Sequence, residues 1–483
     1  MGSAFSLISG LPGQGMLLHL DALSLFFVVL LVPQMLASGL MGLKRHAGFW
    51  GFGVGWALAV LAGNGFSAAL GAGLMLASAW LLRVSTASAS LCEAGLRFGG
   101  VISLLVYGAL RAQSLSPAPL WGVAIMFLGL GLIVGGARQA VFELALKDVM
   151  SALLRAYLGV VVTSLGLAWY SQARGQNQAA HLAFQAVLLG FVVYGLLRPL
   201  LSIGVFEAQK AVGTSSLNWL GGLMRGMPRL GALMLLGLFG LAALPLGPGF
   251  VPVFLLVHAL SAAAQGGLVV AHGAYALVLA IIGFGVALSL IAGIRVIGLG
   301  FLGRPRSLHA AAAEDIQALP FWAMALPAGL LVPLAVVPGF ILLLCTPLLH
   351  LLSPHAGGQA FAYAPLTLWL LIAVALLALG FVQTRFGHSG LREVAAWNDG
   401  FGRPPAWLPF GDPQTQTSAR SLTQPLSWLK GRALLQPELM RRWVRGVNAA
   451  WGRWAGVTRS LSLRASLACA LGGLVLALLV WGA

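Results

Sequence analysis

The sequence predicts an all-α, polytopic membrane protein. Of its 483 residues, 59% are apolar and only 8% are charged, whereas a soluble domain carries about a quarter charged residues. The apolar residues gather in runs close to the ~20 residues that a helix needs to cross a bilayer. Because lipid offers no hydrogen bonds to the backbone, such runs cross it as helices. We expect a bundle of roughly thirteen or fourteen transmembrane helices, some of them broken.

Charge and cysteine content exclude several classes of function. The formal net charge is +17 at pH 7, but the basic residues lie at the ends of apolar runs and in the C-terminal third. This pattern is typical of loops that face anionic lipid and argues against nucleic-acid binding. Cys92, Cys345 and Cys469 stand far apart, with neither a metal-ligand spacing nor a disulfide framework. The sequence also has no nucleotide loop and no haem pair, so we expect no cofactor and no metal.

The apolar runs predict the helices in chain order. Asp21 opens the first run, 21–43, and we interpret it as a helix cap rather than a proton gate. In the connection 139–148, Glu143, Lys147 and Asp148 form either a solvated loop cluster or an ion pair at a subunit contact. The further simple runs lie at about 49–62, 66–82, 94–110, 121–136, 149–169, 181–206, 230–243, 250–264 and 365–382.

Four regions need a separate interpretation. Residues 207–228 are expected to lie outside the membrane. The breaker L-P-L-G-P-G at 244–249 either separates two helices or lies at membrane depth inside a broken one. The run 269–303 is too long for one simple crossing and is steeply tilted, broken or two short helices. The run 321–352 contains four prolines and is expected to make two helices.

The composition changes after the apolar core. We divide the chain into a short N-terminal segment (1–20), a transmembrane core (21–384), a polar extramembrane segment (385–430), an amphipathic helix (431–462) and a C-terminal transmembrane anchor (463–483). Within 438–461, apolar and tryptophan side chains share one helical face and arginines lie elsewhere. This pattern indicates a helix that lies in the membrane interface on anionic lipid, or else one packed on a partner subunit.

Five side chains are candidates for an ion path or for buried structural charges. Arg295 lies deep in the run 269–303, where an unpaired guanidinium costs at least about 3 kcal/mol and must therefore face protein or water. It is either a structural contact to a carbonyl or a neighbouring subunit, or the remnant of a channel. Arg198 and Arg155 either snorkel toward headgroups or contribute to such a path. His258 and His272 are either hydrogen-bonded packing residues or relay members, since imidazole titrates near neutral pH.

Several motifs, in order, resemble those of one family. The motif F-L-G-R-P-R at 301–306, followed by Ala313-Glu314, is similar to the end of a core helix in antiporter-like membrane subunits of formate hydrogenlyase and hydrogenase-4 type complexes. These are relatives of the proton-pumping subunits of respiratory complex I and of multisubunit cation/proton antiporters. The other similar stretches are 20–27 (the start of the family's third helix), 220–228 with 242–250 (L-G-G-L-x-x-x-M-P and A-L-P-P-L-N-G-F), 397–402 (W-D-C-G-[YF]-G) and 415–426 (M-Q-Y-T-A-x-S-F-A-Q-P-L).

The resemblance also shows where this chain departs from the family, in which proton movement is attributed to buried charges on four helices. The place of the fifth-helix glutamate falls in 68–78, which has no carboxylate, and that of the seventh-helix lysine in 129–135, which has no base. On the eighth helix, Ser202 takes the place of the lysine and Arg198 that of the histidine. Only the twelfth-helix basic position remains, as Arg295. Arginine is a poor relay because its high pKa keeps its proton bound.

The resemblance implies a multi-pass subunit of the bacterial inner membrane with other membrane subunits and a peripheral redox arm as partners. We expect a non-catalytic membrane-arm subunit, without a redox centre of its own, that anchors the complex and has lost most of its proton path. The alternatives are a stand-alone or two-component cation/proton antiporter, the membrane subunit of an inorganic-carbon uptake system, and a pure assembly scaffold. The basic residues 44–45 and 210–229 favour the cytoplasm for those loops.

Overall fold

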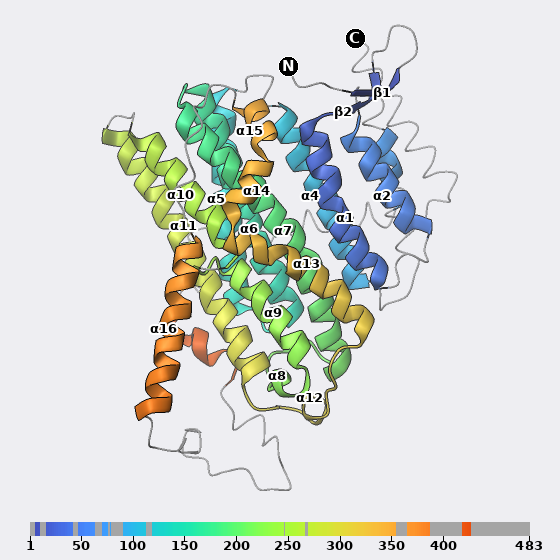
Figure 1. The fold of residues 1–483 in the computed structure, drawn as a ribbon, viewed down its shortest axis with the longest axis vertical. Coiled ribbons are helices and arrows are strands. Elements are labelled where there is room, and N and C mark those ends of the chain that lie inside the picture. Colours follow the sequence, from blue (N-terminus) through green and yellow to red (C-terminus); the bar gives the residue numbers. More distant parts are fainter. Residues whose placement is uncertain are drawn as a thin grey trace, which may run out of the picture. The chain divides into compact units, whose positions relative to one another are not determined.

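The structure is a computed structural model that describes residues 5–9, 16–41, 47–62, 70–75, 78, 90–112, 118–245, 247–265, 269–353, 365–386 and 418–426. Its regular elements are helices apart from one antiparallel hairpin, β1 (Phe5–Ser9) with β2 (Met16–Leu20) (Figure 1). Six helices in these ranges are long and apolar enough to cross a membrane, and five shorter helices are also apolar. The all-α, polytopic fold class is confirmed.

The chain forms two compact units. The smaller unit contains the hairpin, α2 (Ala47–Val60) and the start of α1 (Ala22–Leu40). Asp21 caps α1, because its Oδ1 accepts a hydrogen bond from the Ser24 backbone nitrogen at 2.8 Å and the Ser24 hydroxyl accepts one from the Asp21 nitrogen at 2.9 Å.

The larger unit holds the rest of α1 and the helices from α4 onward. Their bounds are α4 (Ser90–Ala112), α5 (Pro119–Phe142), α6 (Leu146–Ala173), α7 (Asn177–Val212), α8 (Leu223–Gly226), α9 (Pro228–Leu241), α10 (Phe250–Ala264), α11 (Val269–Val296), the π-helix η3 (Ile297–Leu302), α12 (Leu308–Ala311), α13 (Ala318–Val336), α14 (Pro338–Leu344), α15 (Thr346–Leu352) and α16 (Pro365–Phe386). A 3₁₀ turn, η5, covers Ser421–Leu426.

Glycines allow α5 and α6 to pack backbone against backbone. A Cβ added to Gly129 of α5 would lie 2.4 Å from the backbone nitrogen of Thr163, and one added to Gly159 of α6 would lie 2.6 Å from that of Ile133. Gly122 and Gly166 make the same kind of approach one heptad away. Small residues at such contacts let apolar helices gain dispersion energy where lipid provides no hydrophobic driving force.

The helix α7 forms the centre of the larger unit. It packs against α6, α10, α13, α4 and α9, and most of its side chains are buried. It ends where Gly213 adopts a left-handed φ of 75° and donates its backbone N–H to the Gln209 carbonyl at 2.8 Å. The helix therefore continues six residues beyond the apolar run 181–206, and the placement of residues 207–228 outside the membrane stays a prediction. Polar Glu207, Gln209 and Lys210 continue the helix because all three are good helix formers.

Other connections also differ from the sequence predictions. The predicted loop 139–148 shrinks to residues 143–145, so Lys147 and Asp148 belong to the first turn of α6. The run 269–303 is one helix whose last six residues widen into the π-helix η3. The run 321–352 makes three helices instead of two, because Pro338 is the first residue of α14 and Pro347 the second residue of α15.

The breaker at 244–249 separates α9 from α10 (Figure 1). Several predicted segments fall outside the described residues: most of 66–82 and of 385–430, the amphipathic helix 431–462 with its lipid-facing stretch 438–461, and the anchor 463–483. Their helices remain predictions, as does the total number of crossings.

Candidate functional site

The guanidinium of Arg295 is held by backbone carbonyls at the C-terminal end of α5. Its side chain is fully buried. Nη1 donates to the Val141 carbonyl at 2.7 Å, Nη2 donates to the Ala140 carbonyl at 2.9 Å, and Nη2 also bonds the Glu143 carbonyl. The last carbonyls of a helix have no intrahelical partner and carry the negative end of its dipole. A cation placed there gains charge-assisted hydrogen bonds and satisfies oxygens that would otherwise be orphaned.

The side chain of Arg295 also contacts Ala419, more than 120 residues later in the sequence. Arg295 Nη1 lies 3.4 Å from the carbonyl oxygen of Ala419, and the backbone nitrogen of Ala419 donates to Asn218 Oδ1 at 2.9 Å. Ala419 is fully buried. Arg295 therefore links α11 and the end of α5 to Ala419, which lies in the family-like stretch 415–426. Its Nε has no hydrogen-bond partner among the described residues.

Arg198 lies on α7 against an aromatic side chain. Its Nη1 bonds the Tyr194 hydroxyl, and its guanidinium carbon lies 5.7 Å from the centre of the Tyr194 ring. A Cβ built on Gly99 of α4 would lie 3.5 Å from Arg198 Cδ and 3.2 Å from Gln34 Oε1. Arg198 is thus half-buried beside α4. The side-chain amide of Gln34, on α1, lies near the same point of α4.

The remaining candidates lie on the surface of the larger unit. Arg155 is exposed and donates from Nη2 to Gln139 Oε1 at 2.8 Å. His258 is exposed and packs its ring 4.2 Å from that of Phe254, and His272 is exposed near the start of α11. Arg295 and Arg155 both contact the last turn of α5, whereas Arg198 and His258 contact aromatic side chains of their own helices. The described contacts do not gather the five predicted side chains in one site.

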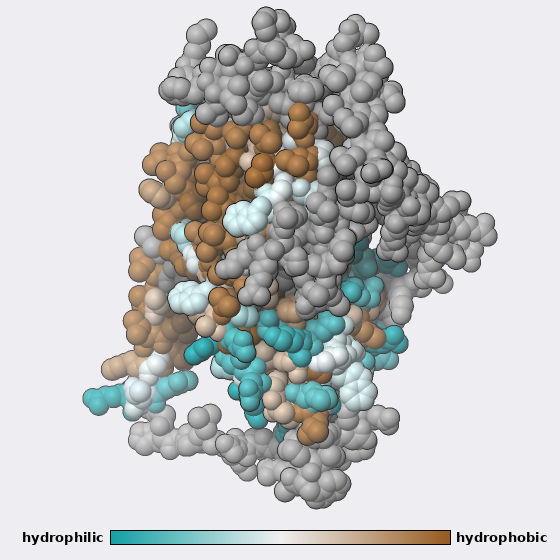
Figure 2. All heavy atoms as spheres, turned by 90° about the vertical axis from the view of Figure 1, so that its right-hand side faces the viewer, coloured by the Kyte–Doolittle hydropathy of each residue, from teal (hydrophilic) through white to brown (hydrophobic). Residues whose placement is uncertain are grey.

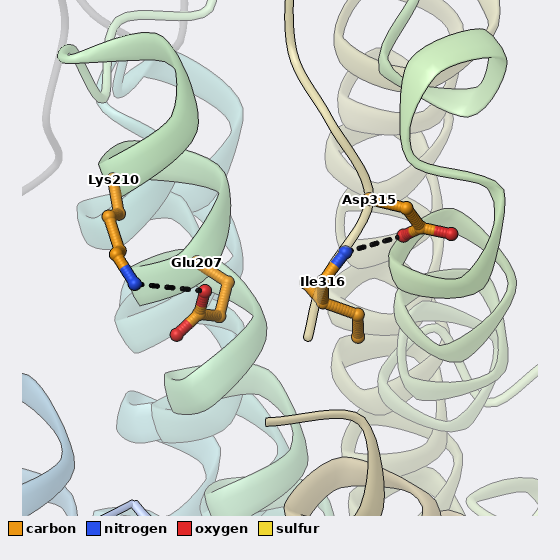
Figure 3. Close-up of polar contacts among 4 residues, drawn as sticks. All are labelled: Glu207, Lys210, Asp315 and Ile316. Carbon is orange, nitrogen blue, oxygen red and sulfur yellow. Dashed lines mark hydrogen bonds and ion pairs between the residues drawn. The ribbon is translucent and has the colours of Figure 1, made fainter. Parts of the chain in front are cut away.

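Two polar sites were missed by the sequence prediction. Glu207 is buried on α7, with its Oε2 3.9 Å from Lys210 Nζ (Figure 3). Near the opposite end of α7, His181 Nδ1 lies 2.7 Å from the Ser353 hydroxyl, and its Nε2 lies 3.1 Å from the Gln185 amide. Gly213 is a sequence signal for the end of a helix, and using it would have placed Glu207 inside α7. No local signal pairs His181 with Ser353.

Asp315 caps a helix that lies far from it in sequence. Its carboxylate accepts hydrogen bonds from the backbone nitrogens of Arg229 at 3.0 Å and Leu230 at 3.4 Å, at the start of α9. It also accepts one from its own neighbour Ile316 at 2.9 Å (Figure 3). These bonds satisfy orphan donors of the first turn of α9 and join the residues that directly follow two of the family-like motifs.

Comparison of the sequence with known proteins finds relatives that share part of this chain. No protein-family model matches the chain. An uncharacterized protein of Mycobacterium tuberculosis is 31% identical over 317 residues, which are 65% of this chain and 49% of that protein. Hydrogenase-4 component B of Escherichia coli is 24% identical over 380 residues, which are 74% of this chain and 56% of that protein. The chain thus spans about half the length of these relatives.

Solved structures share the fold. A chain of the membrane-bound sulfane sulfur reductase, an archaeal respiratory membrane complex, superposes with a TM-score of 0.71 at 17% identity, over 99% of this chain and 92% of that one. A chain of the Mrp complex from Dietzia superposes with a TM-score of 0.56 at 14% identity, over 73% and 88%. The chain is therefore related in sequence to hydrogenase-4 component B and similar in fold to chains of these membrane complexes.

Proposed function

We propose that the chain is a non-catalytic membrane-arm subunit of a redox complex of the complex I-like, group 4 hydrogenase or formate hydrogenlyase type, located in the bacterial inner membrane. In this role it anchors the complex and conducts protons poorly or not at all. The similarity to hydrogenase-4 component B supports the choice of complex. Other membrane subunits and a peripheral redox arm are the partners that follow from the proposal.

The single observation that carries the proposal is the environment of Arg295. A relay residue must release and regain a proton, whereas a guanidinium holds its proton far more tightly than an imidazole or an ammonium does. Both terminal nitrogens of Arg295 are engaged by backbone carbonyls, which cannot accept a proton in exchange. Arg295, which stands at the basic position of the family's twelfth helix, therefore acts here as a structural contact between α11, α5 and Ala419.

A cation/proton antiporter, stand-alone or two-component, is the second candidate, with inorganic-carbon uptake as a variant. The buried carboxylate of Glu207 favours it, because an acid inside a helix beside a lysine is a group that could exchange protons. The fold shared with the Mrp complex chain is compatible with this alternative. The absence of an acid near the middle of a predicted span argues against it.

Purification from the native membrane separates the two candidates. The chain carries a C-terminal affinity tag, is extracted in mild detergent, and its co-purifying proteins are identified. Iron–sulfur, nickel–iron or formate-dehydrogenase-like subunits are expected. A chain that purifies without redox subunits and drives cation-dependent proton movement in liposomes would instead establish the antiporter.

A second measurement tests this structural contact of Arg295. Arg295→Lys and Arg295→Leu are compared with Arg155→Leu, which removes an exposed arginine. We expect Arg295→Leu to impair assembly, while any assembled complex keeps the same number of protons moved per electron. A lower proton yield in a fully assembled Arg295→Leu complex would show that Arg295 belongs to a channel.

A further inference from the structure

Two loops pack tightly at the end of the larger unit that carries α8 and α12. The backbone at Gly221 approaches residue 304 so closely that an added Cβ would lie 2.2 Å from the Arg304 carbonyl oxygen. Gly226 makes a similar approach to the Ala313 carbonyl, at 2.4 Å. The Ser307 hydroxyl donates to the Trp219 carbonyl at 3.0 Å. The stretches 219–229 and 302–322 therefore form one surface, which we call the basic end.

Arginine dominates the basic end. Arg225, Arg229 and Arg304 are exposed. Arg306 is only 5% exposed, and its Nε has no hydrogen-bond partner among the described residues. Burial lowers the pKa of Arg306, because the charged guanidinium loses hydration there.

The basic end holds four arginines against two acids, Glu314 and Asp315, so it keeps a formal net positive charge. The Asp315 carboxylate is already occupied by backbone nitrogens at the start of α9. Glu314 is exposed to solvent. No ion pair to Arg306 occurs among the described residues. A buried cation without a paired anion is costly, so this position is suited to an anion supplied from outside the chain.

Large apolar side chains are exposed on the same two stretches of the basic end. Leu302, Trp219 and Trp322 are 61%, 51% and 62% exposed. Figure 2 shows hydrophilic side chains gathered beneath the apolar surface toward this end of the molecule. Tryptophan and arginine together at the ends of apolar helices are typical of the level of lipid headgroups.

We propose that Arg304 and Arg306, with Arg225 one turn beyond Gly222, bind the phosphodiester headgroup of an anionic phospholipid. The guanidinium groups match phosphate oxygens in charge and in hydrogen-bonding geometry. The acyl chains would lie along the exposed apolar side chains at the end of η3 and the start of α13. An acidic protein partner would satisfy the charges but not the exposed leucine and tryptophan side chains at the same level.

The test uses the full purified chain in a neutral detergent. Phosphatidylglycerol or zwitterionic phosphatidylcholine is added, and the midpoint of thermal unfolding and the retained lipid phosphorus are measured. Arg306→Gln and the double variant Arg225→Gln/Arg304→Gln are compared with the wild type. Arg174→Gln is the matched control. Arg174 is an exposed arginine at the C-terminal end of α6, whereas the N-terminal end of α6 lies near the basic end, through the bridge from Ala145 to Ser216.

We expect phosphatidylglycerol to raise the midpoint of the wild type and the control more than phosphatidylcholine does. The apparent affinity for phosphatidylglycerol should fall at least fivefold in the double variant. If Arg306→Gln fails to fold, the double variant of exposed residues still decides the matter. Equal effects of the two lipids, or wild-type binding by the double variant, would overturn the proposal and favour an acidic protein surface as the partner.

Discussion

Arg295 and Val141 are joined by a 2.7 Å hydrogen bond from a guanidinium nitrogen to a backbone carbonyl, between segments more than 150 residues apart in sequence. This bond ties the end of α11 to the last turn of α5. It places a permanent charge where three other carbonyls also converge. The stability of this junction should therefore depend on one side chain.

Replacing Arg295 by leucine should destabilise the chain by about 3 kcal/mol, because several buried carbonyls lose a charged partner. The thermal midpoint in detergent and hydrogen exchange at residues 418–422 report the loss. Arg295→Lys should recover part of the stability, since an ammonium reaches fewer carbonyls. Arg155→Leu, which removes an exposed arginine, should change the midpoint little. An unchanged exchange rate at 418–422 in Arg295→Leu would show that the arginine does not hold this segment.

Gly129→Val should prevent stable packing of α5 on α6, because the new side chain would overlap the backbone of Thr163. The matched control is Gly131→Val, two residues away on the same helix, where an added Cβ would meet nothing within 4 Å. Both variants change helix propensity equally, so only steric overlap separates them. Yield of folded protein after size-exclusion chromatography is the readout. Equal yields would mean that α5 and α6 do not approach as described.

Asp315→Ala should lower the free energy of unfolding by about 1 kcal/mol, because the first turn of α9 loses its acceptor. Glu314→Ala, at the exposed neighbouring acid, should have an effect below about 0.5 kcal/mol. Chemical denaturation of the two variants under identical conditions makes the comparison. An equal loss at both positions would point to a general charge effect instead of a cap.

Residues 147 and 314 should lie on the same side of the membrane, and residue 174 on the other. The Ala145–Ser216 bridge and the Ser307–Trp219 bond bring the first two regions to one end of the unit. The excess of lysine and arginine at that end predicts that it faces the cytoplasm. Lys147→Cys, Glu314→Cys and Arg174→Cys, each in a background without the native cysteines, can be labelled in intact cells with a membrane-impermeant maleimide. Only the cysteine at position 174 should react from outside.

Much of the helical layout could be predicted from the chain. The start of α10 at residue 250, the span of α1 and the separation of α9 from α10 follow from hydropathy and from proline and glycine. The predicted boundaries failed where polar residues continue a helix, as at Glu207 and Lys147. In those places backbone propensity outweighed the end of the apolar run.

The sequence by itself determined the membrane class, the resemblance to antiporter-like subunits and the unusual charge of Arg295, because these depend on composition and on short motifs. Only the tertiary structure decided what that charge touches, since its carbonyl partners come from α5 and from residue 419. Local sequence patterns reflect hydropathy and helix propensity. They give no information on which distant segments come into contact when the chain folds.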